Sequence, residues 1–414
     1  MLYFKHSELV EKYHVSLKTV HNWIDAAKAG KLNLILLKKG SRTYIANNPN
    51  NDVMLKDLSK QGKKFRNVRF NNMVSPAPAF YDVFNRRQIL DIISNLDIHR
   101  EIPSQYNYMD GGANNWDDWV KRLAREEKPN NLNNTIELVR ADLGTIDKLI
   151  GNRTMVNVID LGVGNGYPVK DLLEYLLKRN NLHRYIAIDI SQSMLDIAER
   201  NVVQWFGNKV NFEGHVRDIT YERFDDLLVD DMLAKEAHQT VNLVLLLGGT
   251  PVNFRSVPDT LKAIYSSMEE HDFIVYTGNP DTEAARRYFD FHPKAGSGDL
   301  SPIDGFILKL LNIDVTLYDV EMGYDERKKM RYVRIRLNAA LTIKFKFQDS
   351  ERNVDLEKGE TILLLRIWHM TALEIIAKFE NAGFVLLHSN MTKDRERMLT
   401  ISGIDTKSDN SDLL

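Results

Sequence analysis

The feature that most constrains the fold is an apolar stretch, residues 156–160, which ends in an acid and runs into a glycine-rich turn. The stretch reads Val-Asn-Val-Ile-Asp160. Glycines then occupy every second position: Gly162, Gly164 and Gly166. Residues 169–176 follow with apolar side chains at helical spacing. Because glycine lets the backbone turn sharply and approach a ligand closely, the pattern predicts a buried strand, a ligand-binding turn and a helix.

The spacing of these glycines favours S-adenosylmethionine (SAM) over a dinucleotide as the ligand. The turn reads Gly-x-Gly-x-Gly, whereas the dinucleotide fingerprint reads Gly-x-Gly-x-x-Gly/Ala. Tyr167 also occupies a place where that fingerprint does not need it. SAM has no pyrophosphate and presents an ammonium, a carboxylate and a sulfonium. We therefore expect Asp160 to meet its cationic end. A strand, turn and helix with no ligand is the alternative interpretation.

Two further predicted strands also end in acids. Residues 184–189 form an apolar run that closes on Asp189, followed by Ser191, and residues 210–217 precede Asp218 and Ile219. An acid in the position of Asp189 can accept both ribose hydroxyls of a nucleoside. We expect Asp218 to accept from the adenine amino group, with Ile219 packed on the ring, and Ser191 to belong to the same cofactor site.

The fourth predicted strand, residues 241–247, leads into Gly-Gly-Thr-Pro-Val-Asn-Phe at residues 248–254. This stretch is similar to the histidine-specific SAM-dependent methyltransferases of the ergothioneine pathway, whose strand is followed by Leu-Gly-Ser-Thr-Ile-Gly-Asn-Phe. Residues 102–116 resemble the upstream Tyr-containing segment of that family. Residues 187–191 resemble its Val-Asp-Val/Ile-Ser, and residues 382–394 its Ala-Gly-Phe and Thr-Asp.

The resemblance covers about residues 100–403 and implies a fold, a cofactor and a set of contacts. The implied fold is α/β, a class I SAM-methyltransferase Rossmann-like core with an inserted α+β substrate domain. The implied SAM contacts are Tyr108, Gly162, Asp189, Asp218 and Ile219, and Gly248 joins them from the loop after the fourth strand. Asn253 would hydrogen-bond an amino-acid substrate, with Thr250 nearby. The expected reaction is N-methylation of an amino-acid-like, small-molecule or peptide amine.

The sequence departs from this family at the substrate positions. The family pattern Gly-Glu-x-Ile-x-x-Glu-x-Ser aligns with residues 359–367, where its Glu and Ser become Leu365 and Ile367. The Tyr-Tyr-Pro-Thr substrate segment has no equivalent. A pocket that is polar in the family is thus predicted to be apolar here, and histidine itself is not expected to be the acceptor.

Residues 1–50 form a separate predicted module. Apolar residues recur at helical spacing before residue 14, and Ser16 can cap a second helix whose apolar stripe includes Trp23. Residues 34–37 and 42–45 then flank a basic turn with a glycine, a predicted hairpin. The module resembles the winged helix-turn-helix of MerR-like and excisionase-like proteins. The resemblance implies that it contacts double-stranded DNA through six residues: Lys18, His21, Asn22, Lys38, Lys39 and Arg42. A protein-interaction or dimerisation module is the alternative.

The rest of the chain divides by composition. Residues 51–99 contain a basic stretch, interpreted as a linker or as an arm that adds phosphate contacts. Strands and helices alternate up to residue 281, and residues 282–369 then interrupt them with strand-like runs at 331–337 and 340–347. The core is accordingly assigned to residues 100–281 and 370–405, the inserted region to 282–369, and a disordered tail to 406–414.

Composition excludes several classes of function. The chain of 414 residues has no cysteine, which excludes disulfides, Cys-ligated zinc, iron–sulfur clusters and a thiolate nucleophile. DNA cytosine-C5 methylation and radical-SAM chemistry are therefore excluded, and no metal site is predicted. The net charge of −2 gives no chain-wide attraction to nucleic acid. With no signal sequence or spanning segment evident, a cytoplasmic protein without membrane contact is expected.

The catalytic base stays unassigned. Three histidines are candidates by residue type alone, and each is more typical of a structural or surface position: His215, His292 and His388. DNA amino-methylation is disfavoured because residues 248–254 lack the Asp/Asn-Pro-Pro-Tyr/Phe that holds a flipped base. A transcriptional regulator, in which a catalytically degenerate methyltransferase fold senses SAM or a metabolite, is the hypothesis from a different class.

Overall fold

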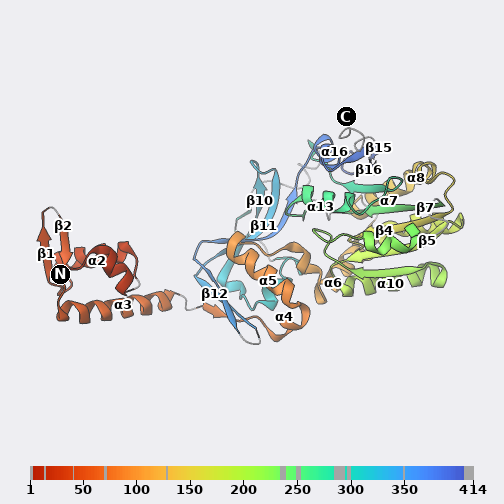
Figure 1. Cartoon of the computed structure of the whole chain (residues 1–414). Helices are drawn as coiled ribbons and strands as arrows, with labels where there is room; N and C mark the ends of the chain where they lie inside the picture. Colours follow the sequence, from red (N-terminus) through yellow and green to blue (C-terminus); the bar gives the residue numbers. More distant parts are fainter. Residues whose placement is uncertain are drawn as a thin grey trace. The chain divides into compact units, whose positions relative to one another are not determined.

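A computed structural model describes residues 3–13, 15–40, 42–69, 72–126, 129–233, 239–248, 253–283, 294–295, 300–347 and 350–404. The chain forms two compact units. The first comprises residues 1–73 together with 340–342, and the second comprises residues 74–339 and 343–414. Each unit is described here by itself (Figure 1). The predicted domain boundaries otherwise stay predictions.

The first unit contains two short helices, a β-hairpin and a longer helix. Its elements are α1 (His6–Tyr13), α2 (Leu17–Lys28), β1 (Leu36–Lys39), β2 (Arg42–Ile45) and α3 (Pro49–Arg69). Leu9, Val20, Trp23, Ile45 and Leu55 are buried together in its core. Since α3 contributes Leu55, this segment is an integral part of the unit. The sequence pattern at 51–69 had indicated a linker or a basic arm, and not this helix.

Local sequence explains the two short helices and corrects the hairpin. The Ser16 hydroxyl accepts from the backbone N–H of Thr19, so the predicted cap of α2 is confirmed. The strand before the turn begins at Leu36 instead of Leu34, and its pairing extends to Lys39 opposite Arg42. Lys38 and Lys39 therefore lie in a strand and not in the turn. The winged helix-turn-helix itself stays a prediction.

The second unit opens with helices that precede the main sheet. They are α4 (Pro78–Val83), α5 (Arg86–Ser94), the π-helical turn η1 (Asn95–His99), the 3-10 turn η2 (Ser104–Tyr108), α6 (Gly111–Arg125), α7 (Asn131–Ala141) and α8 (Leu143–Ile150). Asn85 begins α5 with a reciprocal capping box to Gln88. The close approach of α6 to η2 requires glycine, since a Cβ at Gly112 would lie 1.9 Å from the Asn107 carbonyl oxygen.

The main sheet, as far as the structure describes it, has seven strands in the order β15-β16-β8-β7-β4-β5-β6. Their bounds are β4 (Met155–Leu161), β5 (Leu182–Asp189), β6 (Phe212–Val216), β7 (Thr240–Leu246), β8 (Phe273–Gly278), β15 (Phe384–Met391) and β16 (Met398–Ile404). Strands β4 to β8 pair in parallel with one another, and β16 is antiparallel to both of its neighbours, β8 and β15. This mixed sheet confirms the predicted α/β fold with a class I SAM-methyltransferase Rossmann-like core.

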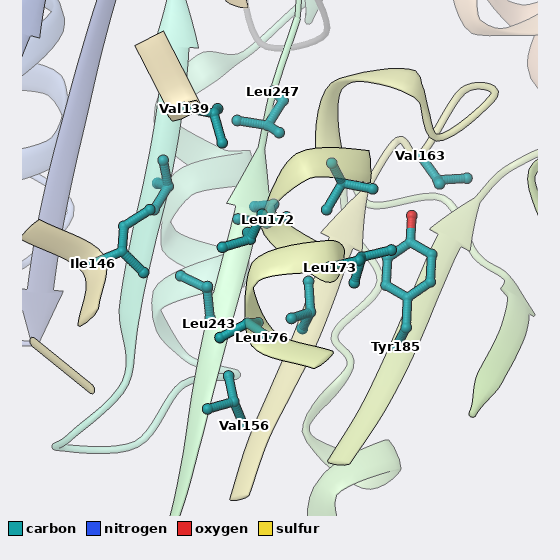
Figure 2. Close-up of a cluster of buried hydrophobic side chains, with 14 of the residues drawn as sticks. Val139, Ile146, Val156, Val163, Leu172, Leu173, Leu176, Tyr185, Leu243 and Leu247 are labelled. Carbon is teal, nitrogen blue, oxygen red and sulfur yellow. The ribbon is translucent and has the colours of Figure 1, made fainter. Parts of the chain in front are cut away.

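Helices cover both faces of this sheet and bury separate apolar clusters. The helices involved are α9 (Lys170–Lys178), α10 (Gln192–Phe206), α13 (Val257–Tyr265) and α16 (Ala372–Glu380), with short turns η3 (Tyr167–Val169), η4 (Gly207–Lys209), η5 (Asp225–Leu228) and α11 (Val229–Leu233). One cluster joins Val156 and Leu243 of the strands to Leu172 of α9, as Figure 2 shows. The other cluster joins Ile159 to residues of α13 and α16. Alternating strand residues thus face opposite helix layers.

The inserted region is mainly antiparallel. It contains β9 (Lys294–Ala295), α15 (Phe306–Leu310), η7 (Val315–Leu317), β10 (Tyr318–Asp325), β11 (Met330–Leu337), β12 (Leu341–Lys346), β13 (Glu351–Leu356) and β14 (Thr361–Trp368). One sheet has the order β14-β11-β10-β9, and another has the order β13-β12-β3, with β3 at Asn72–Val74. Strands β11 and β12 confirm the strand-like runs predicted at 331–337 and 340–347.

Among the described residues, no helix combines the length and apolar character needed to cross a bilayer. Nor do the described histidines and acids form a group of three or more that could hold a metal ion.

Candidate cofactor and acceptor site

Three acids meet at the carboxyl edge of the parallel strands. Asp160 lies near the end of β4, Asp189 is the last residue of β5, and Asp218 follows β6 by two residues. All three are buried. Parallel pairing of β4 with β5 and of β5 with β6 brings the strand ends to one edge, where ligands of open α/β sheets bind.

The glycine turn after β4 adopts a backbone that favours glycine. Gly162, Gly164 and Gly166 have φ angles of 69°, 55° and 75°. A Cβ at Gly164 would lie 3.3 Å from the indole Nε1 of Trp116. The conformation therefore favours glycine at position 164, and a Cβ there would also require the Trp116 side chain to shift by a few tenths of an ångström.

Asp160 is a buried acid beneath this turn. The Tyr185 hydroxyl donates to its Oδ2 at 2.9 Å. Burial raises the pKa of Asp160 to about 7, helped by the charge of Asp189 and opposed by the Tyr185 hydrogen bond. Its charged form is thus costly in the chain alone, and a cationic ligand would favour it.

Asp189 is connected to the same turn. Its carboxylate accepts from the backbone N–H groups of Ser191, at 3.0 Å, and of Gly164 and Ile190. Burial nevertheless raises its pKa to about 6. The backbone N–H of Gly164 lowers the pKa of this carboxylate, so the glycine turn and the second strand end lie next to each other. That they bind a single ligand stays a prediction.

Asp218 and Ile219 lie at the third strand end. The Asp218 Oδ1 accepts from the Thr220 backbone N–H at 3.0 Å, and burial raises the Asp218 pKa. Ile219 is buried. The Ser191 hydroxyl, by contrast, is used to cap α10 by accepting from the Met194 backbone N–H. Its assignment to the cofactor site stays a prediction.

Aromatic side chains from η2 and α6 lie beside the turn. Tyr108 and Trp116 make an edge-to-face contact with centroids 5.3 Å apart. Burial and the charges of Asp304 and Asp189 raise the pKa of Tyr108, so its hydroxyl stays protonated close to the second strand end. Sequence reasoning gave no role to Trp116, although it lies in the segment 102–116 that resembles the family.

Helix α6 is tied to the turn by a chain of polar contacts. The Asn165 amide donates to Asp117 Oδ1 at 2.9 Å, and the Asn201 amide donates to the Asn165 carbonyl at 2.9 Å. Lys121 forms an ion pair with the same aspartate. These contacts hold the backbone of the turn between α6 and α10.

The strand ends of β7 and β8 form the other half of this edge. Gly248 has a φ of 94°, and its N–H donates to the Thr277 hydroxyl at 3.1 Å. Asn253 is half-buried. The next residue is held in place because the Trp368 indole donates to the Phe254 carbonyl at 2.8 Å. Thr250 lies outside the described residues.

The two substituted positions lie on β14. Leu365 pairs with Val333 and Ile367 pairs with Arg331, and both are half-buried. Turn η2, which carries Tyr108, packs against β14 and against α15.

The candidate histidines have structural surroundings. The His388 ring lies 2.8 Å from Asp142, and burial lowers the pKa of His215 beside Glu213. His292 lies outside the described residues. The structure therefore gives no reason to assign either described histidine as a base.

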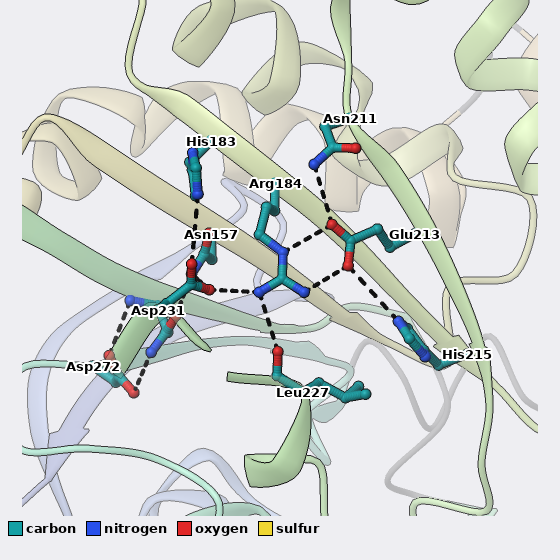
Figure 3. Close-up of polar contacts among 10 residues, drawn as sticks. Asn157, His183, Arg184, Asn211, Glu213, His215, Leu227, Asp231 and Asp272 are labelled. Carbon is teal, nitrogen blue, oxygen red and sulfur yellow. Dashed lines mark hydrogen bonds and ion pairs between the residues drawn. The ribbon is translucent and has the colours of Figure 1, made fainter. Parts of the chain in front are cut away.

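A polar network fills the opposite, amino edge of the sheet. Arg184 donates from Nε and Nη2 to Glu213, at 2.8 and 2.6 Å, and forms an ion pair with Asp231. The Asn242 backbone and side chain donate to Asp272 at 2.9 and 3.1 Å. Figure 3 shows Arg184 between its two carboxylates. This arginine is satisfied within the chain.

In the first unit, all six residues assigned to DNA are exposed: Lys18, His21, Asn22, Lys38, Lys39 and Arg42. A hollow of about 720 Å³ lies between α1, α2 and β2, and its lining includes Lys5, His6, His21, Lys28 and Arg42.

The comparison with protein families assigns the enzyme. A family model described as "Histidine-specific methyltransferase, SAM-dependent" matches residues 86–281, which include the glycine turn and the three strand-end acids. The protein is a SAM-dependent methyltransferase. Its cofactor is SAM. A comparison with curated proteins gave no match.

The methyltransferase is also similar to solved structures at low identity. A SAM-dependent methyltransferase from Clostridium acetobutylicum ATCC 824 is 12% identical, with 70% of this chain and 98% of the other covered and a TM-score of 0.39. An amino pentose methyltransferase from Micromonospora echinaspora is 13% identical, with 70% of this chain and 96% of the other covered and a TM-score of 0.37. A glycopeptide N-methyltransferase in complex with SAM is 11% identical, with 66% of this chain and 94% of the other covered and a TM-score of 0.34.

The residues at the carboxyl edge fit SAM. Asp160 is a buried acid whose charged form an ammonium would favour, and Asp189 is a buried acid whose charged form would gain hydrogen bonds from ribose hydroxyls. The glycine at 164 leaves room that a Cβ would fill. A pyrophosphate would be repelled by the same acids.

Proposed function

We propose that the methyltransferase transfers a methyl group to the amine of an amino-acid-like, small-molecule or peptide acceptor. The observation that carries this proposal is the division of the carboxyl edge. Acids and a glycine turn occupy the β4–β6 half. In the other half, β7 ends at Leu246 and β8 at Gly278, and the loop after β7 presents Asn253, which is half-buried. The first half suits the cofactor and the second suits the acceptor.

The proposed contacts to SAM follow from the strand ends. Asp189 accepts the ribose hydroxyls, Asp160 meets the ammonium of the amino-acid moiety, and Asp218 with Ile219 binds adenine. Gly248 and the glycines at 162, 164 and 166 allow the close approach of the backbone, and Ser191 belongs to the same proposed cofactor site. Bound SAM supplies an activated methyl group on a sulfonium.

The protein's part in the reaction is positioning and exclusion of water. An in-line transfer needs the acceptor atom within about 3–3.5 Å of the methyl carbon. Tyr108 and Trp116 cover the edge next to the glycine turn, and Tyr108 adds cation–π attraction of about 0.5–2 kcal/mol to a neighbouring cation. The acceptor amine reacts as the neutral base, a form that burial favours.

Histidine is disfavoured as the acceptor within this proposal. Leu365 and Ile367 stand where the resembled family has Glu and Ser, and both side chains are half-buried. An imidazole would lose its hydrogen-bond partners in such a pocket, and a polar group left unpaired there costs about 1–3 kcal/mol. An acceptor with an apolar side chain suits these residues better.

The test is turnover of the purified full-length chain with SAM against amino acids, simple amines and short peptides. Mass spectrometry of the products should find one methyl added at nitrogen for at least one class. If calorimetry shows that the folded chain binds SAM but none of these classes is methylated, the proposal of N-methylation is wrong. That outcome would favour the hypothesis of a SAM sensor.

We also propose that the first unit contacts double-stranded DNA. The supporting observation is the exposed set on α2 and the hairpin, next to a hollow whose lining includes Lys5, Lys28 and Arg42. Replacing Lys18 and Arg42 by Ala should weaken duplex binding in a salt-dependent way and leave SAM affinity unchanged. Equal binding of the variant and the parent chain would remove this proposal. Specific duplex binding that SAM modulates, without any methylated product, would favour the regulator.

A further inference from the structure

Arg397 is a buried cation at the carboxyl edge of the sheet. It immediately precedes β16, whose first residue Met398 lies opposite Gly278 at the end of β8. Only 2% of Arg397 is exposed. The side chain therefore lies in the half of the edge that the proposed function gives to the acceptor.

The hydrogen-bond partners of Arg397 are all neutral. Its Nη1 donates to the Asn279 amide oxygen, and its Nη2 donates to the Thr277 hydroxyl at 3.2 Å. Its Nε is buried with no hydrogen-bond partner. Among the described residues no carboxylate forms an ion pair with it. Burial lowers the pKa of Arg397 to about 10, so the group remains charged at neutral pH.

An unpaired buried charge is unusual, and the same sheet contains the ordinary alternative. Buried arginines are normally paired, and even the half-buried Arg184 is paired with Glu213 and Asp231 at the amino edge. A guanidinium offers a planar set of N–H groups that matches a carboxylate. Arg397 thus favours an anionic partner, and no anionic side chain among the described residues is paired with it.

The surroundings of Arg397 connect it to the acceptor half. The Thr277 hydroxyl that accepts from Arg397 also accepts from the backbone N–H of Gly248, the second residue after β7. Thr277 is fully buried, whereas Asn279 is only half-buried. An incoming carboxylate can therefore replace the Asn279 oxygen. The hydrogen bond from the guanidinium to a neutral amide oxygen is then exchanged for an ion pair in which both partners are charged.

We propose that Arg397 binds the carboxylate of the methyl acceptor, so that the acceptor is an amino acid or a peptide with a free carboxylate and not a simple amine. The inference rests on the proposed function. It assigns a specificity-determining role, in which Arg397 fixes one end of the acceptor while the amine faces the methyl group.

The experiment compares matched acceptors. The full-length chain is assayed with the common L-amino acids, their carboxamides and the corresponding decarboxylated amines. For the best pair, the acid should exceed its amide in kcat/KM by about 100-fold, the size expected for losing one partner of a buried charge pair. In Arg397→Gln, this ratio should fall to within about fivefold of one, through a rise in KM for the acid. Arg397→Lys, which keeps the charge, should retain part of the preference.

Two controls separate a binding role from a structural one. Calorimetry with SAM should give the same Kd for the parent chain and for both Arg397 variants. Asn390→Ala, a change at another β15–β16 position that contacts Asp142, should leave the acid-to-amide ratio unchanged. If Arg397→Gln lowers kcat/KM equally for acids and amides, or if the parent chain prefers amides or simple amines, the inference is wrong. If no amine is methylated by chain that binds SAM, the proposed function itself fails.

Discussion

The two edges of the main sheet differ in whether their charged side chains have partners of opposite charge. At the amino edge, Arg184 has two carboxylate partners, and Asp272 accepts from three N–H groups of Asn242 and Glu269. At the carboxyl edge, Asp160 has one neutral donor and Arg397 has only neutral acceptors. Both edges are built on the same strands, a few residues apart.

The difference separates charges that hold the fold from charges that await a ligand. A buried ion pair that is complete within the chain is disrupted at a large cost when one partner is removed. A buried charge without a partner already carries that cost in the free protein, and a ligand of opposite charge offsets it. Changes at the amino edge should therefore alter stability, and changes at the carboxyl edge should alter binding.

The largest expected effect is at Asp189. Replacement by Ala removes two charge-assisted hydrogen bonds to the ribose, each contributing about 1.5–3 kcal/mol, and should raise the Kd for SAM by about 100-fold or more. Calorimetry measures this Kd, and circular dichroism checks that the fold is retained. Asp272→Asn, at the amino edge, is the matched control and should leave the Kd unchanged. Unaltered affinity in Asp189→Ala would remove the ribose assignment.

The reverse experiment is at Arg184. Replacement by Met leaves Glu213 and Asp231 without their cation and should lower the free energy of unfolding of the second unit by about 3 kcal/mol. Chemical denaturation measures the loss, while the Kd for SAM of the folded variant should match the parent. Adding Glu213→Gln should restore part of the stability. A large change in Kd without loss of stability would contradict the division between the edges.

The acids of the carboxyl edge predict a pH dependence of cofactor binding. The pKa of Asp160 is raised to about 7 and that of Asp189 to about 6, whereas SAM favours both charged forms. Binding should therefore release protons below pH 7. The affinity should fall by about tenfold for each pH unit between pH 7 and 6, and by up to about 100-fold for each unit below pH 6, where both acids are protonated in the free chain. Above pH 7 the affinity should be constant. Calorimetry in buffers of different ionisation enthalpy counts the protons, and zero release at pH 6 would contradict the assignment.

The same acids give the opposite sign for stability of the free chain. Because the folded state binds these protons more tightly than the unfolded state, their contribution to stability is complete below the unfolded pKa of about 4. It decreases as pH rises through the folded pKa of about 6 to 7. Saturating SAM should reduce this decrease.

The smallest expected effect is at Gly164. Replacement by Ala places a Cβ 3.3 Å from Trp116 and forces a φ of 55° on a residue that disfavours it, at a cost of about 1–2 kcal/mol. The Kd for SAM should rise by about tenfold. Gly207, with a φ of 62° and open space around its Cβ position, is the matched control. Gly207→Ala should lower stability by a similar amount without altering the Kd, and equal Kd changes in both variants would show that backbone strain alone is responsible.

Much of the core fold was predictable because its signals are local. Period-2 and period-3.6 patterns, the glycine turn after Asp160 and Gly383 after α16 each depend on neighbours in sequence. Helix α3 was not predicted, because its sequence is as rich in charged residues as a linker. Its apolar residues Met54, Leu55 and Leu58 nevertheless pack into the core of the first unit. Thr250 and His292 lie outside the described residues, so their assignments stay predictions.

The sequence by itself determined the order of the strands along the chain, the glycine turn and the acids near the ends of three strands. Each of these features depends only on residues that are neighbours in the sequence. Only the tertiary structure decided which charges are paired. Asp231 reaches Arg184 across 47 positions, and Thr277 reaches Arg397 across 120. The distinction between a structural arginine and one that awaits an anion depends on such distant neighbours, because burial and pairing are properties of the packed chain and not of any local pattern.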